Sequence, residues 1–198
     1  MVLFRRQRLR PGLIFSVNGN KPFSKLVSSV LSSAFNNLPD RVNDIVPTCP
    51  CHDAMIIKLA GKFYVGESRP LKARLTPLAQ YEEEFEGDIS VNPRLFAVKV
   101  ATEIEERKAA EYWLKYVNDT YYDFMAFPKL YLKQRLMYNF HKAAGWEWAH
   151  WCTEGVAKAY QDALGFDVYL KTNPTPLTTI KRVLEGVFVD VSQDMFIP

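Results

Sequence analysis

Residues 52–67 read HDAMIIKLAGKFYVGE, which is the pattern of a β-hairpin. The runs 53–59 and 62–67 are rich in Ile, Val, Phe and Tyr, and Ala60-Gly61 separates them as a two-residue turn. With that turn, Ala54 lies opposite Glu67, and His52 is the diagonal neighbour of Glu67 on the same face of the ribbon. A bulge of one residue would turn Glu67 to the other face. We interpret His52 as a candidate base oriented by Glu67, with a structural histidine and a solvated strand end as the alternative.

The candidate nucleophile is Cys152, in the stretch WCTEGVAKAY at residues 151–160. Positions 152, 156, 159 and 163 share one face at helical spacing, so Cys152 falls in the first turn of an amphipathic helix. Unpaired backbone N–H groups and the helix dipole favour a thiolate there, and they also favour the nearby Glu154 in a structural role. The alternative is that Cys152 is a small buried apolar residue.

The chain resembles the circularly permuted NlpC-type branch of the papain-like cysteine hydrolases, in which the histidine strand precedes the cysteine helix. Residues 10–15, 22–27, 52–67, 122–124, 151–154 and 176–177 are similar, in this order, to the opening strand, short helix, histidine hairpin, Tyr-Asp-Phe element, nucleophile motif and Pro-containing tail of the family. Three residues depart from the family pattern: Leu13 replaces an acidic residue, Thr153 a serine and Gly155 a leucine. The resemblance is therefore to a divergent member.

The resemblance implies an α+β, papain-like, circularly permuted fold, with an antiparallel sheet packed against the helix that bears the nucleophile. It implies acyl transfer through Cys152 with His52 and Glu67, without a metal or an organic cofactor. Relatives cleave peptide amides in cell-wall stems, and others act on lipid amides or esters. Aromatic residues gather before Cys152, and a groove lined by some of them would take a small amide with an apolar or glycan-linked flank. We expect Trp151 and Tyr122 to contact the substrate.

Other functions stay open from the sequence. The same fold could serve as a lipid amide or ester hydrolase, an acyltransferase, or a non-catalytic binding module. Cys49, Cys51 and His52, with His150 and Cys152, could be read as a zinc site, but the Cys-Pro-Cys spacing is poor for zinc. We therefore expect loop cysteines and no metal. His141 and His150 are alternative bases, although each is flanked by aromatic residues typical of a packed histidine.

Composition narrows the class of protein. The chain has 198 residues, 48% of them hydrophobic and 14% aromatic, which fits a single domain over residues 1–198. A formal net charge of +3 is too small to indicate nucleic-acid binding, and no apolar stretch approaches the roughly 20 residues of a membrane span. No signal-peptide core is visible, and three cysteines do not form a closed disulfide framework. We expect a cytoplasmic protein with a peptide or small-molecule substrate, while delivery outside the cell and the oligomeric state stay open.

The remaining elements follow from periodicity and composition. We predict a strand near residues 95–100 and helices over residues 103–117, 129–143, 152–163 and 178–184. The acidic run at residues 82–88 is interpreted as a solvated loop. Arg5, Arg6, Arg8 and Arg10 are interpreted as a solvated entrance to the first strand, with an anionic surface contact as the alternative.

Overall fold

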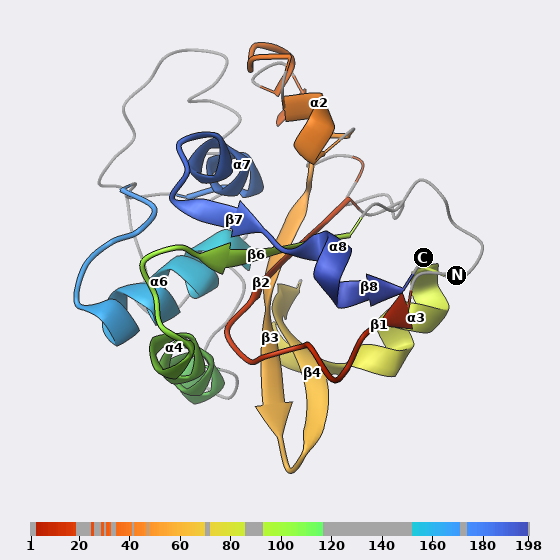
Figure 1. Ribbon diagram of the computed structural model, residues 1–198, viewed down its shortest axis with the longest axis vertical. Helices are drawn as coiled ribbons and strands as arrows, with labels where there is room; N and C mark the ends of the chain where they lie inside the picture. The colour runs from red at the N-terminus through yellow and green to blue at the C-terminus, as the bar shows by residue number, and fades with distance from the viewer. Residues whose placement is uncertain are drawn as a thin grey trace.

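The computed structural model describes residues 3–18, 25, 29, 31–32, 35–40, 42–46, 48–69, 72–85, 93–116, 152–170 and 174–197. Its centre is a six-stranded antiparallel sheet with the strand order β5-β4-β3-β2-β6-β7 (Figure 1). The strands are β2 Ile14–Val17, β3 His52–Leu59, β4 Lys62–Arg69, β5 Lys72–Pro77, β6 Arg94–Val98 and β7 Phe188–Asp190. A separate antiparallel pair joins β1 Leu3–Phe4 to β8 Phe196–Ile197.

Six helices are described: α2 Val42–Ile45, α3 Leu78–Phe85, α4 Glu103–Tyr116, α6 Cys152–Leu164, α7 Pro176–Leu184 and α8 Ser192–Met195. The long helices α4 and α6 pack against each other and against β3 (Figure 1). The predicted α+β class with an antiparallel sheet is therefore confirmed. The papain-like topology and its circular permutation stay predictions.

The hairpin formed by β3 and β4 has the predicted register. Leu59 pairs with Lys62 across the turn, and the ladder continues to the pair formed by Met55 and Gly66. Ala60 and Gly61 have positive φ angles of 48° and 77°, as a tight turn with two left-handed central residues requires. Because the ladder contains no bulge between these pairs, Glu67 and His52 lie on the same face of the sheet, as predicted.

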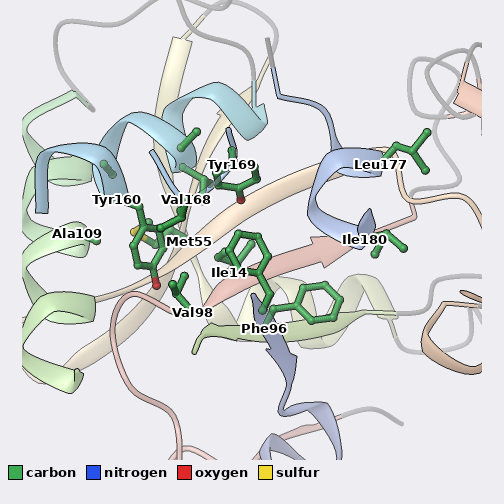
Figure 2. Packing of buried hydrophobic residues seen from close by; sticks show 14 of the residues in the cluster. Ile14, Met55, Phe96, Val98, Ala109, Tyr160, Val168, Tyr169, Leu177 and Ile180 are labelled. Atoms are coloured by element: carbon green, nitrogen blue, oxygen red, sulfur yellow. The ribbon is translucent and has the colours of Figure 1, made fainter. Parts of the chain in front are cut away.

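The sheet is buried on both faces, each against its own hydrophobic cluster. On one face, Met55 and Ile57 of β3 pack with residues of α4, α6 and α7, among them Ala109, Tyr160 and Ile180 (Figure 2). On the other face, the alternate residues Ala54 and Ile56 pack with Leu78 and Tyr81 of α3, and with Phe4, Met195 and Phe196. Successive side chains of β3 therefore point into different hydrophobic clusters on the two faces of the sheet.

Two sequence predictions differ from the structure, and one edge strand has no counterpart among the predictions. The acidic run was expected in a loop, but residues 82–85 belong to α3, because Leu78 and Tyr81 anchor that helix in the second cluster. The last predicted helix begins at Pro176 rather than at 178, because the Thr175 side chain caps it and proline is compatible with the first helical position. Strand β5 was not predicted at all.

The other helices and the strand near residue 95 agree more closely. Helix α4 covers the predicted range as far as Tyr116, and its residues Ala109 and Trp113 are buried. The predicted strand at 95–100 corresponds to β6, which ends at Val98. The predicted helix at 129–143 lies outside the described residues, as does most of the segment 22–27. Within the described part of the chain, no helix is long and apolar enough to cross a membrane.

Candidate active site

His52 and Glu67 form the hydrogen-bonded pair that the hairpin register predicts. His52 is the first residue of β3, and its Nε2 atom lies 2.9 Å from Oε2 of Glu67 on β4. The Glu67 side chain is fully buried, whereas the His52 side chain keeps 15% of its surface exposed. Because Nε2 is occupied by Glu67, Nδ1 is the ring nitrogen left for a second partner.

The buried carboxylate of Glu67 is held by three further side chains. Arg74 of β5 donates from Nε to Oε1 at 3.1 Å, and Thr76 of the same strand donates its hydroxyl to the same oxygen. The Tyr81 hydroxyl of α3 donates to Oε2, next to His52. Tyr81 also packs edge-on against Phe15, with the ring centroids 5.2 Å apart. These donors compensate the burial of a charge that would otherwise be costly.

Cys152 is the first residue of α6 and interacts with His52. Its side chain is 5% exposed, and its Sγ lies 3.9 Å from the hydroxyl of Thr153. Burial lowers the pKa of His52, but hydrogen bonds and charge interactions with Cys152 and Glu67 outweigh it and raise that pKa to about 10. His52 is therefore protonated at neutral pH in this arrangement. The structure thus brings the predicted nucleophile, base and orienting carboxylate together.

A buried polar group next to these residues was not predicted from the sequence. The Asp53 carboxylate is fully buried and accepts hydrogen bonds through Oδ2 from Thr153 of α6 at 2.9 Å and from Thr179 of α7 at 2.7 Å. Burial raises the pKa of Asp53, and the hydroxyls of Thr179, Ser16 and Thr153 lower it. Ser16 stands opposite Asp53 in the β2–β3 ladder, which places its hydroxyl near this carboxylate. However, neither Ser16 Oγ nor Asp53 Oδ1 forms a hydrogen bond of normal geometry with a described residue.

Trp113 of α4 fills the space between the hairpin and the cysteine helix. Its side chain is 1% exposed, and its ring lies close to Gly66 of β4 and to Gly155 of α6. A Cβ atom at Gly66 would lie 2.8 Å from Trp113 Cε3 and 2.8 Å from Ile57 Cγ1, which is too close for a side chain. At Gly155 the nearest atom, Trp113 Nε1, would be 3.5 Å away, an ordinary contact. The tight site is therefore on the strand that carries Glu67.

The two expected substrate contacts, Trp151 and Tyr122, lie outside the described residues, as do His141 and His150. Cys49 and Cys51 lie in the segment before β3, as predicted, and both are buried, with thiols that donate to the backbone carbonyls of Pro50 and Val17. Burial and the neighbouring Cys51 raise the pKa of Cys49 to about 12. Over the ranges that the structure describes, no three His, Cys, Asp or Glu residues are placed to hold a metal ion together.

The N-terminal arginines contact carboxylates of distant elements. Arg6 pairs with Glu82 of α3, and Arg8 lies 3.3 Å from Asp194 of α8. Arg10 is bonded to the buried Glu106 of α4. Three of the four arginines therefore form ion pairs between the first segment of the chain and a helix, whereas the sequence predicted a solvated strand entrance.

No protein-family model matches the chain, and no curated protein matches it. It is similar to a solved structure described as the crystal structure of metalloprotein yiiX from Escherichia coli O157:H7, DUF1105. The sequence identity is 18%, the match covers 96% of each chain, and the TM-score is 0.49. The family of the chain therefore stays a prediction.

Proposed function

We propose that the protein is a cysteine hydrolase of the papain-like, circularly permuted NlpC type, and that it cleaves a small amide through Cys152. The observation that carries this proposal is the hydrogen bond between His52 and the buried Glu67, with Cys152 as the other partner of the imidazole. A nucleophile beside a base that a third group orients is the arrangement used in covalent acyl transfer.

The reaction begins with attack of the Cys152 thiolate on the substrate carbonyl, which forms the Sγ–C bond. The backbone N–H of Cys152, at the N-terminus of α6, helps to stabilise the oxyanion. His52, protonated at neutral pH, gives its proton to the amine as the C–N bond breaks. His52, now neutral, takes a proton from a water molecule that attacks the acyl carbonyl, the C–Sγ bond breaks, and the acid leaves with the Cys152 thiolate and the protonated His52 restored.

Within this mechanism, Glu67 fixes the ring orientation of His52 and supports its positive charge. It bonds Nε2, so that Nδ1 is the nitrogen available to exchange a proton with Cys152 and the leaving group. The three other donors to Glu67 come from β5 and α3, which keeps the carboxylate in place while the proton moves. None of these steps requires a group other than side chains, backbone and water.

The substrate class follows from the family resemblance and from the aromatic residues that precede Cys152 in the sequence. We propose a small amide such as a cell-wall stem peptide, with a lipid amide or ester as the alternative acyl donor. If the acceptor were an amine or alcohol instead of water, the same acyl enzyme would make the protein an acyltransferase.

A substrate panel tests the proposal. Stem-peptide fragments, N-acyl amines, an acyl ester and a denatured protein are incubated with the wild-type chain and with Cys152→Ala. We expect cleavage of at least one small substrate by the wild type and none by Cys152→Ala. Alkylation of Cys152 at mildly acidic pH, followed by peptide mass spectrometry, separates an active site from a binding module, since only the thiolate reacts readily. Cleavage that survives in Cys152→Ala, or cleavage of the denatured protein alone, would contradict the proposal.

A further inference from the structure

Asp53 and Thr153 join the strand that carries the proposed base to the helix that carries the proposed nucleophile. Asp53 follows His52 directly in β3, and Thr153 follows Cys152 directly in α6. The Thr153 hydroxyl donates to Asp53 Oδ2 at 2.9 Å, and both side chains are fully buried. We infer that Asp53 and Thr153 form a positioning link that fixes Cys152 relative to His52. This inference rests on the proposed function.

The alternation of side chains along β3 makes such a link possible. Successive residues of a strand point to opposite faces of the sheet. His52 shares its face with Ala54 and with Glu67, whereas Asp53 shares its face with Met55, which packs in the cluster beneath α4 and α6. Strand β3 therefore points His52 toward Glu67 and points the next residue, Asp53, toward the helix that carries Cys152.

The link is short at both ends. A single peptide unit separates His52 from Asp53, and another separates Cys152 from Thr153. Between Asp53 and Thr153 lies one buried hydrogen bond. A shift of the first turn of α6 along the sheet therefore requires this bond to lengthen or break. Such a shift would increase the distance between the Cys152 sulfur and the His52 imidazole. Misplacement of reacting groups by about 1 Å can cost roughly 100-fold in rate.

Thr179 of α7 supplies an internal control, because it donates to the same oxygen of Asp53 at 2.7 Å. Its Oγ1 also lies 3.4 Å from the hydroxyl of Tyr169. Removing the Thr179 hydroxyl takes one donor from Asp53, as removing the Thr153 hydroxyl does. Only Thr153, however, is bonded through the backbone to Cys152. A general loosening of the Asp53 site and a loss of positioning can therefore be told apart.

The experiment compares Thr153→Val, Thr153→Ser and Thr179→Val in the full chain. Valine matches the shape of threonine without its hydroxyl, and serine keeps the hydroxyl. The readout is the rate of Cys152 alkylation by iodoacetamide from pH 5 to pH 9, followed by peptide mass spectrometry to distinguish Cys152 from Cys49 and Cys51. We expect Thr153→Val to slow the reaction about 10-fold and to shift its pH profile. Thr153→Ser restores the rate, and Thr179→Val stays close to the wild type while its melting temperature falls.

Two results would overturn the link: a folded Thr153→Val with the wild-type rate and pH profile, or equal slowing by Thr153→Val and Thr179→Val. If Thr153→Val does not fold, Thr153→Ala replaces it and is judged in the same way. Failure of the proposed function looks different. In that case, the wild-type Cys152 reacts no faster than an ordinary free thiol, or hydrolysis survives in Cys152→Ala. A reactive wild type with an unaffected Thr153→Val overturns the positioning link alone.

Discussion

Glu67 is the residue on which most of the described site converges. Its carboxylate contacts His52 from the same hairpin, Arg74 and Thr76 from β5, and Tyr81 from α3. Three of these partners are buried or nearly so, whereas the Arg74 side chain keeps 41% of its surface exposed. A buried carboxylate with this many donors has a fixed orientation, because rotation would break several hydrogen bonds together. The imidazole of His52 inherits that orientation.

Replacing Glu67 by Gln tests this role. The variant keeps the shape of the side chain but removes the negative charge, so we expect the His52 pKa to fall from about 10. Turnover should drop, yet remain about one to two orders of magnitude above that of Cys152→Ala, because losing an orienting group is milder than losing the nucleophile. Steady-state kinetics and NMR titration of the histidine ring protons measure the two effects.

Tyr81→Phe is the matched control for Glu67→Gln. It removes one donor to the Glu67 carboxylate and keeps the charge, so its effect on the His52 titration should be smaller. Wild-type activity in Glu67→Gln would contradict the orienting role of the Glu67 charge.

At the scale of elements, Trp113 lies against β4 and α6 and leaves different amounts of space for a side chain at Gly66 and at Gly155. Gly66→Ala forces a Cβ atom to within 2.8 Å of the Trp113 ring and of Ile57. We expect a loss of about 1–3 kcal/mol of unfolding free energy, the usual range for an overpacked core. Gly155→Ala adds only an ordinary contact and a better helix former, so it should gain up to about 1 kcal/mol.

Urea unfolding of the two glycine variants measures this difference. The sign of the change is the test, because both variants add one methyl group next to the same tryptophan. A destabilised Gly155→Ala together with a neutral Gly66→Ala would show that the space around Trp113 is arranged differently.

The elements that the sequence predicts well are those with a strong local pattern. The hairpin has a turn of two residues between apolar runs, and α4 has regular apolar spacing, so both were predicted almost to the residue. Strand β5 reads KARLTP and lies at the edge of the sheet, where charged residues and proline are tolerated, so it lacks the alternation of a central strand. In α3, Leu78 and Tyr81 are deeply buried, and the four polar or acidic residues of the helix hide the apolar pattern.

The candidate site divides in the same way. The pairing of His52 with Glu67 depends on hairpin register alone, which sequence determines locally. The contact of Asp53 with Thr153 and Thr179 joins residues that are 100 and 126 positions apart, across three elements. Such a contact depends on how two helices are placed over the sheet. No local motif around Asp53 indicates it.

At the scale of the whole molecule, the charged His52 makes the stability of the fold depend on pH. Its pKa is about 10 in the folded protein and about 6.5 in an unfolded chain. Below pH 6.5 the imidazole is protonated in both states, so the stabilisation of its charge by Cys152 and Glu67 is fully present. Between pH 6.5 and 10 the unfolded chain binds fewer protons than the folded one, so this stabilisation is lost as the pH rises.

The difference in unfolding free energy between the wild type and Glu67→Gln isolates the part of this effect that is due to Glu67, because the groups other than residue 67 are common to both. From about pH 5.5 upward, where carboxyl side chains are ionised, we expect the difference to be constant up to about pH 6.5 and to shrink steadily toward pH 10. Chemical denaturation across this range provides the measurement. A difference that grows with pH would mean that His52 is neutral in the folded protein.

The pairing of β1 with β8 has a consequence for the connectivity of the chain. Leu3 lies opposite Ile197 and Phe4 opposite Phe196, with the two phenylalanine rings 5.0 Å apart, so residues 3 and 197 are neighbours (Figure 1). A short linker could join them into a ring, and the ring could be reopened at an exposed turn such as Gly186. Reopening at Ala60-Gly61 would instead remove the covalent connection between the strand of His52 and that of Glu67. We therefore expect this architecture to tolerate a new order of its elements, provided that the covalent turn between those two strands is kept.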